Sequence, residues 1–482
     1  MTGEWMMKQR TRFMGAILCI ALLLTACGKN DTPAISPEEE ALQRYKQACE
    51  NVSQAPDITL EVDYTLSRTV GGEVYTEKMT EMESFRGLHT KDAVASVKQQ
   101  VTFGSYETQY AEFYRNGTAY CKTDDTTFCA EMDMEQFRSR LVPTVLLSAS
   151  IYGTVKVDKV FNNTVISFSA PTKLEKWATD YSAAELLSAT GTAVLDKDGN
   201  LSKSTYIAEF TCEKTKYELQ VSVGVKRETA ENLDEDLSTL PKKCPQLSYF
   251  DAPRKILQVV GDVYTAQAMS AKYTETVDSV AFARKRSQTS YFDIYGAGKD
   301  FMAQSSYEVI NTDYSNTPVT NSEVVIFRNN VCTSSLNDAD PTIREGITGE
   351  TMRRFCEDAV LAALFTPNHL ENAKLTKKKD ELRIDFTGNT AFSDNLCSSI
   401  YSIFNANLDN YAESFTTPIA EGYLCIDKAS GLPTALGIQL ERVHIAGDVP
   451  YSLTYQLDQS MQLSSAKAYE NITGEPMTEP AA

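Results

Sequence analysis

The feature that most constrains the fold is an ordered series of matches between the two halves of the chain. The Arg-Asn-Asn stretch at 328–330 stands 213 residues after the Arg-Asn-Gly stretch at 115–117, and each follows a strand-like segment that carries an aromatic residue. Further along, 426–431 repeats the turn-like pattern of 195–199. One match would be chance, but a series in constant order indicates an internal duplication. The sequence therefore predicts two tandem copies of one domain.

Each predicted copy opens with a helix and continues with strands. Ser36, Pro37 and Glu39 form the N-terminal signature of a helix over 37–53, whose apolar residues recur at helical spacing. Directly after it the apolar period becomes two, which indicates half-buried strands. The same order begins again at Asp251. We therefore expect mixed helix and strand in both copies.

Further helical patterns interrupt the strands. They lie near 133–147 and 174–188 in the first copy and near 350–364 and 393–410 in the second. Two stretches within them, 142–151 and 359–365, are unusually apolar for surface helices. Such helices either pack on a sheet or form the floor of an apolar cavity that takes a hydrophobic ligand. The sequence leaves both interpretations open.

The segment between the copies is acidic and then carries Pro and Lys, and it is not rich in Gly or Ser. This composition favours a defined relation between the two halves over a loose linker. The predicted organisation is a signal peptide at 1–26, a polar tether at 27–36, a first repeat at 37–240, a second repeat at 251–467 and a disordered polar tail at 468–482.

The N-terminal region has the pattern of a signal peptide. Lys8, Arg10 and Arg12 precede an apolar run at 13–23, which is shorter than the roughly 20 residues that a membrane span needs. The next four residues, Leu-Thr-Ala-Cys, resemble the lipobox of bacterial lipoproteins. The resemblance implies cleavage before Cys27 and a diacylglycerol thioether on its thiol. We expect a protein anchored in the cell membrane and facing outside the cytoplasm. An ordinary secretory signal with a chance cysteine is the alternative.

The charge balance restricts the partners. The chain has 46 Lys and Arg against 65 Asp and Glu, a net charge of −19. Removing the signal segment takes away three basic residues and one acidic residue, so the mature protein is more acidic still. This balance argues against nucleic acid as a partner and against binding to anionic lipid heads, since both favour basic patches.

Nine of the 11 cysteines remain after Cys19 and Cys27 are set aside, and an odd number cannot pair completely within one chain. Most lie singly in apolar patterns, where a buried free thiol is the expected state. Cys121 and Cys129 flank a short polar stretch and could form a disulfide across a hairpin; two free thiols are the alternative. No pair has zinc-site spacing, so no metal site is predicted.

No catalytic constellation stands out. His89, His369 and His444 are far apart, and none lies beside a plausible nucleophile; no nucleophile elbow or phosphate-binding loop occurs. The stretch 196–200 resembles a calcium loop but lacks the later Glu, so it is interpreted as a hairpin turn. Lys-Lys-Lys at 377–379 is interpreted as a solvated turn. The sequence therefore predicts a protein that is not an enzyme and uses no cofactor.

The order of elements in each copy resembles the outer-membrane lipoprotein carrier (LolA/LppX-like) superfamily, and within it the uncharacterised lipoproteins of Gram-positive bacteria. Asp-Lys-Ala-Ser-Gly-Leu-Pro at 427–433 is the most family-like stretch, and 196–201 is its looser copy. The resemblance implies an α+β fold of two tandem curved antiparallel sheets, or half-barrels, each with helices on its concave face.

The same resemblance implies a lipid or acyl chain held between sheet and helices, without assigning contact residues. Two functions are therefore in competition. The first is a membrane-anchored extracytoplasmic lipoprotein that binds a lipid or other hydrophobic ligand. The alternative is a non-enzymatic scaffold lipoprotein that binds another envelope protein.

Overall fold

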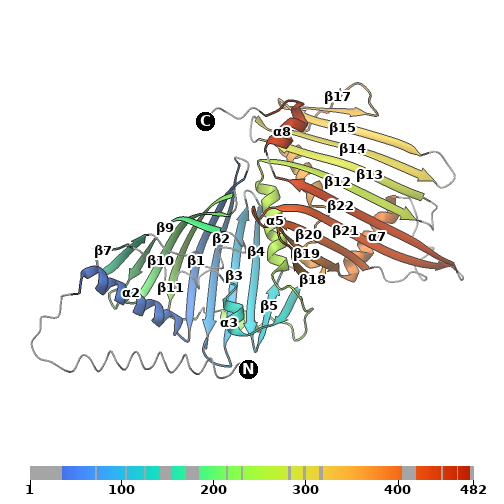
Figure 1. Ribbon diagram of the computed structural model, residues 1–482. Helices are drawn as coiled ribbons and strands as arrows, with labels where there is room; N and C mark the ends of the chain where they lie inside the picture. The colour runs from blue at the N-terminus through green and yellow to red at the C-terminus, as the bar shows by residue number, and fades with distance from the viewer. Residues whose placement is uncertain are drawn as a thin grey trace, which may run out of the picture.

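The computed structural model shows two open antiparallel sheets of eleven strands each (Figure 1). It describes residues 35–70, 73–103, 106–123, 126–141, 154–169, 184–212, 215–229, 232–279, 284–296, 300–313, 318–403, 419–446, 449–463 and 465–477. Sheet 1 comes from the first half of the chain and sheet 2 from the second half. The fold is α+β, as predicted.

The strands alternate buried and accessible side chains, as the apolar period of two requires. In sheet 1 they are β1 Ile58–Val70, β2 Glu73–Arg86, β3 Val94–Phe103, β4 Tyr106–Arg115, β5 Thr118–Lys122, β6 Thr127–Glu131, β7 Thr154–Val160, β8 Asn163–Ser169, β9 Ala184–Leu195, β10 Leu201–Cys212 and β11 Thr215–Lys226. In sheet 2 they are β12 Ala268–Ser279, β13 Arg284–Tyr295, β14 Met302–Asp313, β15 Val319–Arg328, β16 Val331–Leu336, β17 Thr342–Ile343, β18 Leu370–Lys377, β19 Glu381–Gly388, β20 Ile419–Asp427, β21 Pro433–Ala446 and β22 Val449–Gln462.

Strand order confirms the duplication. Sheet 1 runs β6-β5-β4-β3-β2-β1-β11-β10-β9-β8-β7, and sheet 2 has the same order with every strand number raised by eleven. The two matched turns also agree: Asn116 and Gly117 join β4 to β5, and Asn329 and Asn330 join β15 to β16, all four with positive φ. Two-residue hairpins of this kind need residues that tolerate left-handed backbone. The matches seen in the sequence are therefore matches of the fold.

Side-chain caps mark the starts of helices at Ser36, Asp133 and Thr348, whereas Asp251 makes no side-chain cap hydrogen bond. The helices are α2 Pro37–Ser53, α3 Met134–Arg138, α4 Leu233–Ser238, α5 Ala252–Thr265, α6 Gly349–Leu361, the 3-10 turn η4 Pro367–His369, α7 Thr390–Ile403 and α8 Ser465–Thr473. Ser36 caps α2: its side chain accepts a hydrogen bond from the Glu39 amide, and the Glu39 carboxylate accepts one from the Ser36 amide. No helix among these is long and apolar enough to cross a membrane.

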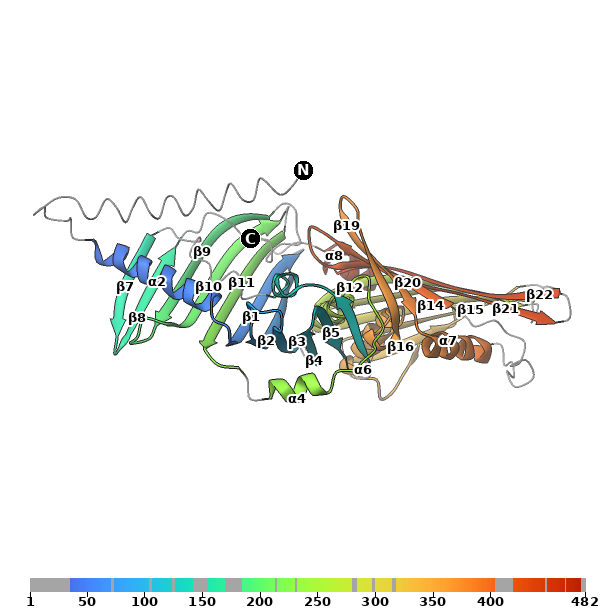
Figure 2. The same ribbon diagram turned by 90° about the horizontal axis from the view of Figure 1, so that it is seen from below.

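Helices cover both faces of the sheets. We call the face of sheet 1 that carries Leu60 and Val62 its inner face; α2 packs there on β7 to β10 and α5 on β2 to β4. In sheet 2 the inner face carries Met269 and Ile294 and is covered by α6 and α7. By contrast, α4 and α8 lie on the outer faces; Figure 2 shows α4 outside the row of strands of sheet 1. The concave-face helices were predicted, and the outer ones were not.

Two sequence predictions are wrong in part. The tail was expected to be disordered from residue 468, but α8 runs to Thr473, because Ala468 and Ile472 bury one face of it against sheet 2. The helix expected near 174–188 overlaps β9, which begins at Ala184. The apolar stretch at 142–151 lies outside the described residues.

One apolar core runs through both sheets. It joins buried side chains of sheet 1, of α5 and of sheet 2 into a single cluster. The expectation of a defined relation between the halves agrees with this packing, and an apolar recess lies at the join between them.

Candidate functional site

Helix α5 forms the seam between the two halves. Its buried residues Ile256, Val259 and Val263 enter the shared core, and the helix contacts β2, β3 and β4 of sheet 1 as well as α6 and η4 of the second half (Figure 1). The corresponding helix of the first half, α2, instead packs on β7 to β10. The opening helix of the second repeat is therefore shared with sheet 1.

A buried charge cluster fixes α5 on sheet 1. Glu112 of β4 is fully buried and accepts two hydrogen bonds from Arg140, at 2.8 and 3.0 Å, and one from Arg254 of α5 at 2.8 Å. Arg140 also pairs with Asp251 at the start of the helix, with 3.0 Å between Nε and Oδ1. Burial alone would raise the pKa of Glu112, but Arg140 and Arg254 outweigh it and hold the pKa below its usual value. The cluster is thus a charged clamp.

A second buried pair holds the other end of the helix. Arg68 of β1 donates to Asp262 of α5, and both side chains are about 5% exposed. The two clamps stand at opposite ends of α5, so the helix cannot rotate without breaking a buried ion pair. Its remaining face is therefore held in one orientation toward the second half.

A pocket opens between β4, α5 and the end of α6. Its volume is about 370 Å³. The apolar wall comes from the half-buried face of α5, with Leu257 and Val260, and from Leu361 and Leu364 at the end of α6. Tyr110 of β4 also lines it, with its hydroxyl donating to Glu112 at 2.8 Å. The pocket is thus bounded by sheet 1 on one side and by helices on the other.

Polar groups and two tyrosines bound the rest of the pocket. Tyr106 of β4 and Tyr264 of α5 stack with their ring centroids 5.4 Å apart. Tyr264 donates to Asp358 at 2.9 Å, and burial together with that hydrogen bond raises the pKa of Tyr264 to about 12. Thr123 donates to Asn368 across the seam at 2.7 Å. An apolar recess with a few polar groups suits a ligand that is largely hydrophobic and has a polar end.

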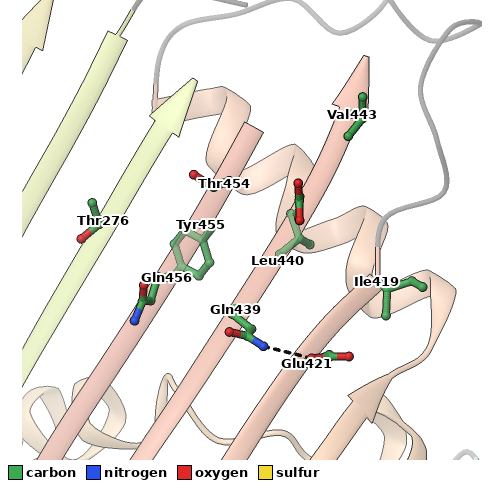
Figure 3. A pocket seen from close by; sticks show the side chains of 10 residues that line it. Thr276, Ile419, Glu421, Gln439, Leu440, Val443, Thr454, Tyr455 and Gln456 are labelled. Carbon is green, nitrogen blue, oxygen red and sulfur yellow. Dashed lines mark hydrogen bonds between the residues drawn. The ribbon is translucent and has the colours of Figure 1, made fainter. Parts of the chain in front are cut away.

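Sheet 2 has a different kind of surface on its outer face. Five neighbouring strands each contribute one polar residue, and each of these residues lies directly opposite the next one in register. In the order β12, β22, β21, β20 and β19, they are Thr276, Gln456, Gln439, Glu421 and Thr387. Two recesses of about 700 Å³ each share Glu421, Gln439 and Gln456. Figure 3 shows one of them, with Gln439 donating to Glu421 at 2.9 Å. The three residues that the two recesses share are therefore all polar.

Tyr423 lies flat on the same outer face. A Cβ placed on Gly437 of β21 would come within 2.2 Å of the Tyr423 ring, so only glycine leaves the ring room to cross that strand. The Tyr423 hydroxyl then donates to Asp458 of β22 at 2.8 Å. The Arg383 guanidinium lies over this ring, 4.2 Å from its centroid. We call this ring, together with the row of polar residues beside it, the polar platform of sheet 2.

Cys121 and Cys129, which could have formed a disulfide across a hairpin, are not bonded to each other. Cys129 is bonded to Cys244 instead, with 6.0 Å between their Cα atoms, and Cys121 is a buried free thiol. The reason is register: Cys121 is opposed to Phe128 and Cys129 to Tyr120, so the two cysteines point to opposite faces of the hairpin. The bond ties β6 to the segment before α5, where Cys129 also donates to the Pro245 carbonyl at 2.8 Å.

The other predicted positions stay apart. The His89 ring contacts the Ser53 carbonyl at 3.0 Å, and the His369 ring stacks on Phe392. Within the described residues no group of three His, Cys, Asp or Glu side chains is placed to hold a metal ion. Asp196 accepts from the amides of Asp198 and Asn200, as in a hairpin turn. Cys27 lies outside the described residues.

The sequence did not identify the pocket, although a signal existed. Residues 256, 259 and 263 form one apolar stripe on α5, and residues 257, 260 and 264 form another. A helix that is apolar on two sides must contact two surfaces.

Comparison with known proteins gives distant likenesses. No family model matches the chain, and no curated protein matches it. Among solved structures, LprF from Mycobacterium bovis aligns at 10% identity over 39% of this chain and 93% of its own, with a TM-score of 0.22. A DUF1329 family protein from Desulfovibrio piger aligns at 14% identity over 41% and 95%, with a TM-score of 0.17. An AttH-type protein from Nitrosomonas europaea aligns at 8% identity over 85% and 93%, with a TM-score of 0.14. These likenesses are too distant to assign a role to any residue of this chain.

Proposed function

We propose that this chain is a lipid-anchored extracytoplasmic protein that binds a hydrophobic ligand in the pocket between sheet 1, α5 and α6. The observation that carries the proposal is the pocket itself, an apolar recess between sheet 1, α6 and the helix α5, which buried ion pairs clamp in place. Clamped walls favour binding because a preformed site pays less ordering entropy.

The pocket size restricts the ligand class. A volume of about 370 Å³ has room for roughly a dozen groups of the size of a water molecule or a methylene. A short acyl chain or the end of a longer one fits this volume, and the polar residues of the lining can face a polar head. We infer an amphiphile with one hydrophobic chain.

Two features support the extracytoplasmic placement. The lipobox-like stretch ending at Cys27 is the sequence argument. The bond between Cys129 and Cys244 is the structural one, since disulfides persist mainly in oxidising compartments. The anchor itself is tested by Cys27→Ser, which should move the protein from the membrane fraction to the soluble fraction.

Native mass spectrometry of the detergent-extracted full chain tests the ligand. The wild-type protein should carry an adduct of lipid or acyl mass. Val260→Trp fills the pocket with a larger apolar side chain and should abolish the adduct, whereas Leu187→Trp, on an exposed strand position (54% accessible), should keep it. An adduct that survives Val260→Trp would place the ligand elsewhere, and no adduct on the wild type would refute the binding function.

The polar platform on sheet 2 favours a second candidate, a scaffold that binds another envelope protein. Its support is the row of in-register polar residues and the Tyr423 ring held flat over Gly437. A photo-crosslinking residue at position 456 should capture one defined protein from intact cells. The same residue at position 187 serves as the control and should capture none.

A further inference from the structure

The hairpin between β7 and β8 ends in an unusual tip. Phe161 is 100% exposed, more than any other large apolar side chain among the described residues, and its neighbour Val160 is 48% exposed. Val160 is paired with Asn163, so Phe161 and Asn162 alone form the loop. Single exposed apolar residues are ordinary, but two adjacent ones at the end of a two-residue loop form a projecting apolar point.

Phe161 also adopts a costly backbone conformation. Its φ is +53°, in the left-handed region that an aromatic residue rarely visits. The other non-glycine residues with positive φ in the described chain are Asn116, Asn329, Asn330, Asn337 and Asp338. Those side chains tolerate this region because they are short and polar. A phenylalanine at this position therefore costs both backbone strain and exposed apolar area, and at 100% exposure its ring gains no burial in return.

The second repeat provides an internal comparison. The equivalent hairpin joins β18 to β19, and its loop is the Lys-Lys-Asp stretch at 378–380. That loop is folded back: Lys378 pairs with Glu381 at 2.8 Å, and Lys428 donates to the Lys379 carbonyl at 3.0 Å. The duplicated architecture therefore does not require an apolar tip, and only the first repeat has one.

We propose that Phe161 and Val160 insert into the interfacial layer of the membrane that holds the protein, as a second contact beside the lipid anchor. This step rests on the anchoring part of the proposed function. The charges near the tip fit a lipid surface: Lys156 pairs with Asp158, the only acid on the two strands, at 3.5 Å, which leaves Lys159 beside the tip as a net positive charge. An exposed aromatic residue flanked by lysines is typical of interfacial contacts.

The geometry allows both contacts at once. Helix α2 begins at Pro37, ten residues after Cys27, and packs on β7 and β8. Ten residues span at most roughly 35 Å, and the seven-residue strand β7 spans roughly 23 Å. The tip is therefore within reach of the bilayer surface while Cys27 is anchored. Two contacts would fix the orientation of the protein above the membrane, which a single point of attachment does not.

Tryptophan quenching in vesicles tests the insertion. The full chain carrying Phe161→Trp is reconstituted through its anchor into phosphatidylcholine–phosphatidylglycerol vesicles with brominated acyl chains, and its emission is compared with that of the wild type, which contains Trp177. We expect a blue shift and loss of most of the added emission. The matched control Lys379→Trp, at the equivalent exposed loop of the second repeat, should be neither shifted nor quenched.

The two proposals fail in different ways. If Phe161→Trp protein floats with the vesicles but its added emission is unquenched, the insertion is refuted while the anchor stands. If Cys27→Ser protein remains with the membrane as fully as the wild type, the anchor is refuted. Quenching of both tryptophan variants alike would also refute a specific tip contact, and so would cross-linking of position 161 to a protein.

Discussion

Replacing Arg140 by methionine is the most informative perturbation of the seam. Methionine keeps an apolar side chain but removes the guanidinium, which lies 4.5 Å from the centroid of the Phe250 ring, makes two hydrogen bonds to Glu112 and pairs with Asp251. Glu112 has 0% accessible side-chain surface, so its charge cannot be rehydrated in place. Removing one partner of a buried ion pair typically costs about 3–5 kcal/mol. Because Arg254 still donates to Glu112, we expect about 3 kcal/mol.

The assay is urea unfolding followed by circular dichroism, with the free energy of unfolding compared at unchanged slope. The matched control is Arg44→Met, which removes the exposed pair with Glu40 and should cost about 0.3–0.5 kcal/mol. Adding Glu112→Gln to Arg140→Met should restore about 1–3 kcal/mol, because the uncompensated charge is then gone. If Arg140→Met costs no more than Arg44→Met, the cluster does not clamp α5 as described.

The pH dependence gives an independent check of the same cluster. The pKa of Glu112 is lowered in the folded protein, so its stabilisation is complete above the ordinary value of 4.5 and is lost as the pH falls through the lower folded pKa. The stability difference between the wild type and Glu112→Gln should therefore be constant from pH 7 to pH 5 and shrink below about pH 4.5. A difference that grows on acidification would contradict the assignment.

Two further predictions concern the disulfide and α6. The double variant Cys129→Ser, Cys244→Ser should have a free energy of unfolding lower by about 2–4 kcal/mol, because the disulfide closes a loop with a sequence separation of 115 residues. In urea titrations, a reductant should destabilise the wild type and leave the double variant unchanged. Burial raises the pKa of Glu357 to about 7 despite its pair with Arg353, so the folded state loses stability as the pH rises from 4.5 through 7. Glu357→Gln should therefore stabilise the protein at pH 8 by on the order of 2 kcal/mol and lose that gain near pH 4.5, as urea midpoints at the two pH values would show; an equal effect at both would refute the pKa assignment.

The strands and the duplication could be predicted because they depend on local signals. Alternation sets which residues of β2 and β4 are buried, and residues that tolerate positive φ, such as Asn116, mark the hairpins. The partners of each element could not be predicted in the same way. The apolar stripes of α5 require covering surfaces, but nothing in their spacing says that one of them is sheet 1.

The partner of Cys129 could not be predicted for a similar reason. Cys121 and Cys129 were placed across a hairpin correctly, but their facing depends on the register, and a shift of one residue reverses it. The tail shows the opposite case. Ala468 and Ile472 are too few to mark a helix in a polar segment, and their burial on sheet 2 decides the structure.

The functional candidates lie where the two repeats differ. The strand order is identical in both, so it cannot by itself distinguish one half from the other. Helix α5 breaks the symmetry by packing on the preceding sheet, and the pocket at the seam exists only because of that displacement. The loop at Phe161, between β7 and β8, also breaks the symmetry of the two repeats, because the equivalent loop of the second repeat carries lysines. A seam arises once in a tandem pair, so the proposed ligand is expected to bind with one molecule per chain despite the duplicated fold. A stoichiometry of two would place the ligand within each repeat instead.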